Sequence, residues 1–256
     1  MTTVGIVQAR TTSTRLPGKM LLDLAGAPLI VRMLERVSRA RTLDALWLAT
    51  STDRSDDELA GMVEARGVSV FRGALEDVLS RFQAVVQLSG ADVVVRLTGD
   101  CPLHDPDVID AAVRLFRDSG GELDFLSNTL EPTYPDGLDV EVVGRAALER
   151  AHREATLPLD REHVTPYITG ASGRPRSFRL GQLRAGADFS HLRWCVDQQD
   201  DLEFARAVCT ALLPGNPQFG WLDVVALLTR EPQLLELNRH LTRNDKFLKE
   251  LEQSRP

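Results

Sequence analysis

The sequence of 256 residues is poor in cysteine and has no long apolar run. Its three cysteines, Cys101, Cys195 and Cys209, are widely spaced and include no C-x-x-C pair. This pattern argues against a disulfide framework or a cysteine zinc site and favours a reducing cytosol. No stretch reaches membrane-spanning length, and the short N-terminal apolar run lacks the preceding basic residues of a signal peptide. We therefore expect a cytoplasmic protein with no membrane partner.

A basic excess is also missing. The formal net charge is −7 and the pI is about 5.3. Proteins that bind nucleic acids or anionic membranes carry a surplus of basic residues, so neither partner is expected. With 43% hydrophobic and 26% charged residues, the chain can bury a full core. Because no linker, repeat or low-complexity tract interrupts it, residues 1–256 are predicted to form a single domain.

Apolar runs of strand length alternate with segments of helical periodicity in the first half of the chain. The strands are expected near residues 6–7, 45–49, 68–71 and 92–98. The intervening helices are expected over residues 28–41, 55–65 and from residue 75 to near Gly90. This β-α-β-α order predicts an α/β fold with a mostly parallel, doubly wound sheet and helices on both faces.

The pattern changes after residue 120. Short strands at 124–128, 138–143 and 177–180 and helices near 145–155 and 160–169 indicate a small inserted antiparallel layer over about residues 120–185. Such a layer would shape an acceptor pocket or a dimer contact. The remaining elements are a strand at 194–196 and helices at 202–213, 221–229 and 232–251. The charged stretch 243–252 within the last helix is interpreted as a solvated face.

The loop after the first strand is the most informative segment. Residues 10–19 read R-T-T-S-T-R-L-P-G-K and place Arg10, Arg15 and Lys19 among four hydroxyl residues just before a helix. Fixed cations combined with hydroxyl and backbone N–H donors suit a polyphosphate. The loop is not a P-loop, because the order G-x-x-x-x-G-K-[ST] is absent. The alternative is a surface loop whose basic residues are merely solvated.

Two acidic segments follow later strands. Asp100 lies in the R-L-T-G-D-C-P run at residues 96–102, and Asp197 begins the D-Q-Q-D-D run. Ligands of α/β sheets bind beyond the carboxyl ends of the strands. A carboxylate there, facing the basic loop, could hold Mg²⁺, which favours a few carboxylates together with waters and substrate phosphates. The alternative is helix capping, by Asp100 near residues 105–107 and by Asp197, Asp200 or Asp201 before the next helix.

Together these segments resemble a known family. The chain is similar to the cytidylyltransferases that make CMP-linked sialic acid or CMP-Kdo, and looks closest to their SpsF-like branch of spore-coat polysaccharide biosynthesis. The resemblance implies a Rossmann-like nucleotide-diphospho-sugar transferase sandwich of the GT-A type. The matching segments stand in family order: Q-A-R with S, R and P-G-K (8–19), R-L-T-G-D-C-P-L (96–103), S-N (127–128), Y-P-D-G-L-D-V-E (134–141), D-R-E-H-V-T-P-Y (160–167) and R-W-C-V-D-Q-Q-D-D-L (193–202).

The resemblance also implies an activity and a set of site residues. The enzyme would transfer CMP from CTP to an acidic sugar or related small acceptor, releasing pyrophosphate, with Mg²⁺ as cofactor. By analogy with its relatives it would be a homodimer. The residues implied for the triphosphate are Arg10, Ser13, Arg15 and Lys19; for the base Ala9, Asp77 and Arg96; for Mg²⁺ Asp100 and Asp197; and for the acceptor Gly137, Asp139, Glu141, Arg161, Glu162 and His163. The catalytic group among them would be Arg10, Lys19, Asp100 and Asp197.

Several alternatives stay open at this point. The acceptor could instead be an amino sugar, a phosphorylated molecule or a phosphonate, and His163 could be a hydrogen-bonded structural histidine. A related NTP:sugar-phosphate nucleotidyltransferase would usually carry a glycine-rich loop after the first strand. A glycosyltransferase would need an Asp-x-Asp metal motif, but Asp105-Pro-Asp107 reads as a helix start. A nucleotide-binding regulator without turnover is the non-enzymatic alternative.

Overall fold

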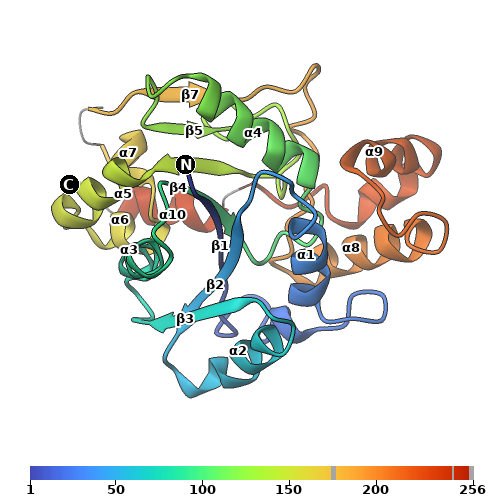
Figure 1. Cartoon of the computed structure of the whole chain (residues 1–256). Coiled ribbons are helices and arrows are strands. Elements are labelled where there is room, and N and C mark those ends of the chain that lie inside the picture. Colours follow the sequence, from blue (N-terminus) through green and yellow to red (C-terminus); the bar gives the residue numbers. More distant parts are fainter. Residues whose placement is uncertain (174–176, 244, 254–256) are drawn as a thin grey trace.

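The computed structural model describes residues 1–173, 177–243 and 245–253, and this part of the chain contains a seven-stranded sheet (Figure 1). The strand order is β3-β2-β1-β4-β6-β5-β7. Its parallel half consists of β1 (Thr3–Gln8), β2 (Ala45–Ser51), β3 (Ser69–Gly73) and β4 (Val93–Thr98). β1 and β4 are covered on both faces, which explains why their sequences are mostly apolar.

The other half of the sheet contains a change of direction. β6 (Glu141–Gly144) runs antiparallel to β4 and to β5 (Phe125–Ser127), and β5 pairs in parallel with β7 (Leu180–Gln182). Because β6 runs opposite to β4, the first residue of β6 lies beside Arg96, near the carboxyl end of β4. The predicted α/β fold, a mostly parallel sheet with a small antiparallel layer, is confirmed.

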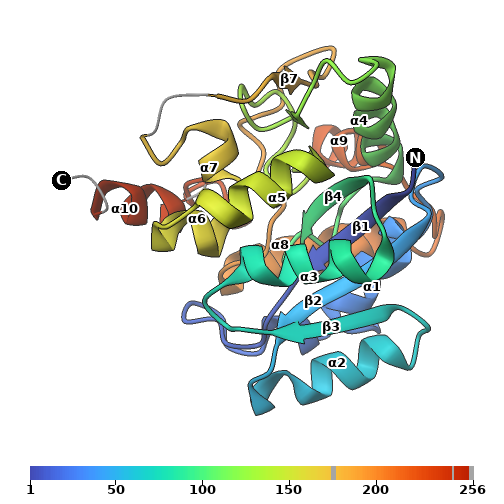
Figure 2. The same cartoon turned by 60° about the vertical axis from the view of Figure 1, so that its left-hand side comes forward.

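Helices cover both faces of the sheet (Figures 1 and 2). One face packs against α1 (Leu29–Val37), α2 (Asp57–Glu64), α4 (Pro106–Asp118), α8 (Gln199–Leu212) and α9 (Trp221–Arg230). The opposite face packs against α3 (Val78–Ser89) and α5 (Arg145–Glu154). Within the described residues, no helix combines the length and the apolar character needed to cross a membrane.

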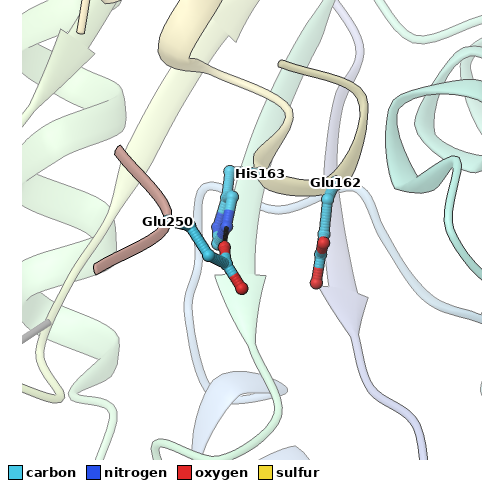
Figure 3. Close-up of side chains that lie close together, drawn as sticks. All are labelled: Glu162, His163 and Glu250. Carbon is cyan, nitrogen blue, oxygen red and sulfur yellow. Dashed lines mark hydrogen bonds and ion pairs between the residues drawn. The ribbon is translucent and has the colours of Figure 1, made fainter. Parts of the chain in front are cut away.

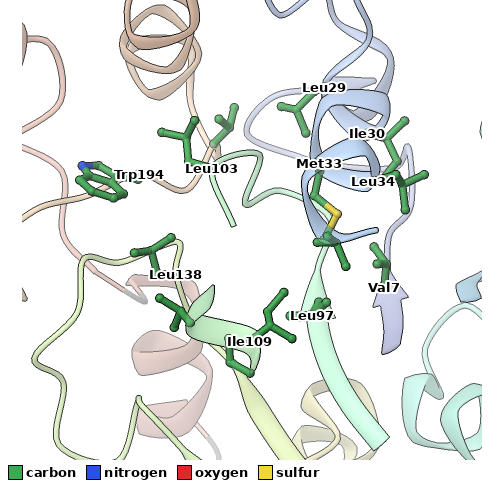
Figure 4. Close-up of a cluster of buried hydrophobic side chains, with 14 of the residues drawn as sticks. Val7, Leu29, Ile30, Met33, Leu34, Leu97, Leu103, Ile109, Leu138 and Trp194 are labelled. Atoms are coloured by element: carbon green, nitrogen blue, oxygen red, sulfur yellow. The ribbon is translucent and has the colours of Figure 1, made fainter. Parts of the chain in front are cut away.

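Helix α1 shows how the periodicity of the sequence builds the core. Its apolar side chains recur every three or four positions and are all buried: Leu29, Ile30, Met33, Leu34 and Val37. Figure 4 shows Met33 pointing from α1 toward Leu97 of β4 and Val7 of β1. The neighbouring residue of β1, Ile6, belongs to the core on the other face, because successive side chains of a strand point to opposite sides.

The predicted strand at residues 194–196 is wrong. The segment makes only an isolated bridge, between Arg193 and Asp136, in the described residues. Hydrogen bonds flank that bridge, since Asp136 donates its N–H to Leu192 and accepts one from Trp194. Gly137 has a left-handed φ of 103°, and the N–H groups of Leu138 and Leu192, which would extend the ladder, donate instead to the carbonyls of Pro135 and Phe189. The partner segment therefore cannot continue a ladder in either direction.

Two predicted helices are interrupted. The helix expected at 160–169 divides into α6 (Pro158–His163) and α7 (Pro166–Thr169), because Val164 has a φ of 71° and Pro166 lacks an N–H. The helix expected at 232–251 divides into the 3₁₀ turn η3 (Pro232–Leu237) and α10 (Asp245–Gln253). Asn238 ends η3, and its buried amide donates to the Arg193 carbonyl at 2.9 Å. The strand expected at 177–180 lies slightly later, as β7.

His104 connects the core to the pH dependence of folding. Its side chain is fully buried between the sheet and the helices, and burial, with a smaller contribution from Arg36, lowers its pKa from 6.5 to about 4. The unfolded chain takes up this proton near pH 6.5, whereas the folded chain resists it until about pH 4. Acidification through this window should therefore favour unfolding by roughly 3 kcal/mol in total through this one group.

Replacing His104 by leucine should remove that part of the acid sensitivity. The free energy of unfolding of the unmodified protein should fall by roughly 2 kcal/mol more than that of His104→Leu between about pH 7.5 and pH 5. Urea denaturation at the two pH values measures this difference. His191→Leu, at an exposed position, is the matched control. Equal pH dependence of the protein and His104→Leu would contradict the interpretation.

Candidate active site

A cavity of about 600 Å³ opens at the carboxyl ends of β1 and β4. Arg10 follows β1 by two residues and Asp100 follows β4 by two residues, while the antiparallel β6 begins at the same edge. This topology explains how segments far apart in the sequence meet. The residues implied from the sequence that line the cavity are Ala9, Arg10, Ser13, Arg15, Lys19, Arg96, Asp100, Asp139, Glu141, Glu162, His163 and Asp197.

The basic loop is held in place by a buried carboxylate. Asp56 accepts hydrogen bonds from the backbone N–H and the hydroxyl of Thr11 at 2.7 and 2.8 Å, and from the Ser51 hydroxyl at 2.5 Å. The Gly18 N–H closes the loop onto the Thr11 carbonyl at 3.0 Å. Gly18 adopts a left-handed φ of 69°, which glycine accepts without strain, and so turns the chain into η1 (Lys19–Leu21). Lys19 is thereby fixed at the cavity.

Lys19 joins the two acidic segments. Its Nζ lies 2.8 Å from a carboxylate oxygen of Asp100 and 2.8 Å from one of Asp197, and it also donates to the Val196 carbonyl at 2.9 Å. Burial alone would lower the pKa of Lys19, but the two carboxylates outweigh it and raise the pKa above its ordinary value. Burial would raise the pKa of Asp100, whereas Lys19 lowers it to about 2. Lys19 and Asp100 are therefore both charged at neutral pH.

The two arginines of the loop also face carboxylates. Arg15 lies 2.8 Å from Asp197, and Arg10 lies 3.3 Å from Glu162 of α6. Roughly a third of each arginine side chain is exposed, 30% for Arg15 and 29% for Arg10. These guanidinium groups can reach an incoming anion, because they are paired but not enclosed.

Helix capping is carried out by other residues. Asp105 caps α4 by accepting the Asp107 N–H at 2.9 Å, as expected from a helix start at this position. Asp201 closes the first turn of α8, where it accepts the Gln198 N–H at 3.1 Å. Neither Asp100 nor Asp197 caps a described helix. Both carboxylates instead line the cavity.

A buried arginine that sequence reasoning gave no role stabilises this arrangement. The guanidinium of Arg193 contacts both oxygens of Asp201 at 2.9 and 3.0 Å, Asp136 at 3.0 Å and Asp197 at 3.3 Å. Only 7% of Arg193 is exposed. It therefore orients Asp197 from behind while Lys19 and Arg15 contact the same carboxylate from the cavity side. In the sequence, Arg193 stands four residues before Asp197 and eight before Asp201, and this proximity is the feature from which its contacts with the two carboxylates could have been predicted.

The opposite wall of the cavity is acidic. Glu141 pairs with Arg96 at 2.5 Å and accepts the Thr165 hydroxyl at 3.0 Å. Asp139 pairs with Arg243 at 2.6 Å. Burial and the nearby carboxylates, Glu141 among them, outweigh Arg243 and raise the pKa of Asp139 to about 7. Arg243 was missed in the sequence because it follows Asp139 by 104 residues and belongs to no recognised motif.

Three implied residues lie outside the cavity lining. Asp77 caps α3 by accepting the Ser80 N–H at 2.9 Å, and its other oxygen accepts from Arg161 at 2.5 Å. This pair ties α6 to α3. Gly137 packs so closely on the backbone of residues 194–195 that a Cβ atom there would approach it to 2.7 Å. These residues support the walls of the cavity and do not form its surface.

The C-terminal helix α10 closes one side of the cavity and corrects the prediction of a wholly solvated face. Phe247 lines the cavity, and its ring stands edge-on to that of His163 at 5.0 Å. Figure 3 shows Glu250 beside His163, with Glu162 next to them. Glu250 is 2.7 Å from His163 Nε2, and the ligand-type atoms of these three residues lie within 4.8 Å of one another. Glu162 pairs with Arg10 at 3.3 Å, whereas burial lowers the pKa of His163, so the contact of His163 with Glu250 is a hydrogen bond in the wall of the cavity.

Comparison with known proteins agrees with this geometry. A family model described as cytidylyltransferase matches residues 4–211. SpsF of Bacillus subtilis (strain 168), a spore coat polysaccharide biosynthesis protein, is 33% identical over 234 residues, which cover 89% of this chain and 94% of that protein. A 3-deoxy-manno-octulosonate cytidylyltransferase of Anaeromyxobacter sp. (strain Fw109-5) is 31% identical over 239 residues, covering 80% and 96%. The structure of a cytidylyltransferase from Leptospira borgpetersenii matches with a TM-score of 0.86 at 30% identity, covering 91% and 96%.

The matched region runs from β1 into α8 and so contains the basic loop, Asp100 and Asp197. It also contains the sheet whose carboxyl edge forms the cavity. Sequence, fold and site geometry thus agree over most of the chain. The protein belongs to the cytidylyltransferase family of nucleotidyltransferases, in its SpsF-like branch.

Proposed function

We propose that the protein transfers CMP from CTP to a sugar-type acceptor and releases pyrophosphate. The observation that carries this proposal is the convergence of Lys19, Asp100 and Asp197, with both carboxylates 2.8 Å from one ammonium group. Arg10 and Arg15 extend the positive side of the same cavity. In the proposed function the whole chain works as one nucleotidyltransferase domain, and a homodimer is the expected assembly.

The chemistry asks the protein mainly for position and charge. An acceptor oxygen attacks the α-phosphate in line, the bond to the β-phosphate breaks, and pyrophosphate leaves. Arg10, Ser13 and Arg15 would bind the triphosphate, and Lys19 would neutralise charge near the breaking bond. Preorganised cations in a cavity of restricted water access stabilise such spreading negative charge strongly. Ala9 and Arg96 would border the base.

The two carboxylates fit a divalent cation. Asp100 and Asp197 present hard oxygen donors, and Lys19 keeps Asp100 ionised with a pKa of about 2. Both line the cavity and are partly exposed to it, with 28% of the Asp100 side chain and 19% of the Asp197 side chain accessible. Asp100 and Asp197 would hold Mg²⁺, which when bound supplies additional neutralisation of phosphate charge.

The acidic wall would receive the acceptor. Because the pKa of Asp139 is about 7, this side chain can donate or accept a hydrogen bond at neutral pH. Glu141, Glu162 and His163 lie on the same side and offer further partners for sugar hydroxyls or an amino group. An acidic sugar, an amino sugar and a phosphate- or phosphonate-bearing molecule are the acceptors to compare.

Calorimetric titration with CTP, UTP, GTP and ATP, each with Mg²⁺, tests the nucleotide half of the proposal without any acceptor present. We expect selective binding of CTP. Replacing Asp100 by asparagine removes one negative charge from the proposed cation site and should weaken CTP binding at least ~10-fold, about 1.4 kcal/mol. Asp118→Asn, at an exposed position in the last turn of α4, should leave the affinity unchanged.

Two results would speak against the proposal. If no triphosphate binds, the basic loop is not a nucleotide site. If CTP binds Asp100→Asn and the unmodified protein equally well in the presence of Mg²⁺, the carboxylate is not part of that site. Selective binding that weakens in Asp100→Asn but not in Asp118→Asn would support both the nucleotide and the cation assignment.

A further inference from the structure

A second cavity, of about 140 Å³, lies behind the loop that carries Asp100. It is lined by Arg36 of α1, by Arg39 just beyond the end of α1, by Pro102 of the loop, and by Gln218 and Phe219 before α9. Its volume is close to that of a cavity, roughly 150 Å³, that admits a benzene molecule. The cavity is therefore large enough for a small ligand. Three arginines line it, Arg32 together with Arg36 and Arg39, and so does Glu35, which pairs with Arg32 at 3.2 Å.

The Arg39 side chain carries two buried donors that have no hydrogen-bond partner among the described residues. These donors are Nε and Nη2, and both atoms are fully covered. Burying such donors without an acceptor is costly, and native proteins rarely leave them unmatched. Nε and Nη2 form one edge of the guanidinium plane, the edge that binds two oxygens of a phosphate or carboxylate side by side.

Arg36 adds a second charge that no carboxylate neutralises at ion-pair distance within the described part of the chain. It is 6% exposed, stacks on the Phe219 ring at 4.2 Å, and donates to the carbonyls of His104 at 2.9 Å and Phe219 at 3.0 Å. Burial, and then the charge of Arg39, lower its pKa to about 10. Glu35 is paired with Arg32, so within the described residues the charges of Arg36 and Arg39 are not offset at ion-pair distance.

We propose that this cavity binds a small oxyanion of the phosphate class, at a site separate from the basic loop. Because the Nε and Nη2 edge of Arg39 is covered, the side chain would turn this edge toward the cavity to donate to the anion, and Arg36 and Gln218 would complete the surroundings. The chemistry is shared by inorganic phosphate and by the pyrophosphate that the proposed reaction releases, and titration with each anion distinguishes these sources.

The position of this cavity connects it to the loop that carries Asp100. Pro102 lines the cavity and follows Asp100 by two residues, and Arg36 holds the carbonyl of His104 further along the same loop. An anion bound to the two arginines would therefore contact the segment that positions Asp100. This link rests on the proposed function, whereas anion binding itself does not.

Calorimetric titration with inorganic phosphate, and separately with pyrophosphate, tests the site. Because the basic loop can also bind these anions, the same titrations are made with Arg39→Gln and Arg15→Gln. Arg39→Gln should weaken one binding event at least ~10-fold and leave CTP binding unchanged, whereas Arg15→Gln should weaken the other event. Arg230→Gln, at an exposed position at the end of α9, is the matched control and should change neither.

A dependence on Arg39 for either anion supports the site, even if CTP does not bind. Titrations of Arg39→Gln that superimpose on those of the unmodified protein for both anions would overturn it. Should Arg39→Gln fail to fold, crystals of the unmodified protein soaked in selenate give an independent measurement. An anomalous difference peak beside Arg39 supports the proposal, and peaks confined to the Lys19 loop overturn it.

Discussion

Replacing Lys19 by methionine is expected to weaken CTP binding by ~10²- to 10³-fold, about 3 to 4 kcal/mol. Methionine keeps the unbranched stem but removes the ammonium group that lies 2.8 Å from both Asp100 and Asp197. The variant therefore loses a cation for the triphosphate and leaves Asp100 without the ammonium group that it pairs with, whereas Asp197 keeps its contacts with Arg15 and Arg193. Calorimetric titration with CTP and Mg²⁺ measures the effect directly.

Lys249→Met is the control for this experiment, since Lys249 is an exposed lysine of α10. It should bind CTP like the unmodified protein. A circular dichroism spectrum and a thermal melt of Lys19→Met are needed, because loss of the fold would also abolish binding. If the folded variant binds CTP with unchanged affinity, Lys19 does not contact the triphosphate, and the proposed role of the basic loop is wrong.

The largest effect on stability is expected from Arg193. Replacing it by methionine should lower the free energy of unfolding by about 3 to 5 kcal/mol, because it leaves the buried carboxylates of Asp136 and Asp201 without their common cation. Those carboxylates are 5% and 0% exposed. Urea denaturation near neutral pH measures the loss.

The pH dependence separates this charge effect from a packing defect. Carboxylates left without Arg193 should have raised pKa values in the folded state, so their destabilisation is largest at high pH and shrinks as they are protonated. The deficit of Arg193→Met should therefore be smaller near pH 5 than near pH 8. Arg179→Met removes an exposed pair with Asp124 and should cost under about 1 kcal/mol. A deficit that is constant with pH would indicate lost packing instead.

The parts of the site that could be predicted from the sequence come from segments next to strong strands. β1 and β4 are mostly apolar, and the polar residues that follow them, Arg10 and Asp100, were placed at one sheet edge by the rule for parallel strands. That rule depends only on local pattern and on strand direction. Asp139 and Glu141 were associated with the acceptor by resemblance, and the antiparallel direction of β6 gives the physical reason that they reach the same edge.

Other features depend on contacts between distant segments, which local pattern does not encode. Arg243 contacts Asp139, and Phe247 lines the cavity, only because the chain returns to this edge of the sheet after α9. The strand expected at 194–196 had the apolar residues of a strand but lacked a partner able to extend a ladder. The unmatched donors of Arg39 likewise become visible only once α1 and the Asp100 loop are packed together.

The pairing of Arg15 with Asp197 has a consequence for turnover. In the proposed function, a phosphate oxygen of the nucleotide would take the place on the Arg15 guanidinium that the Asp197 carboxylate occupies. Nucleotide entry would then be an exchange of one anion for another, which would moderate the affinity for the triphosphate and for pyrophosphate alike. When the product departs, the resident carboxylate can recapture the arginine at once. Asp197 would thus compete with phosphate for Arg15 and help to release the product before the next cycle.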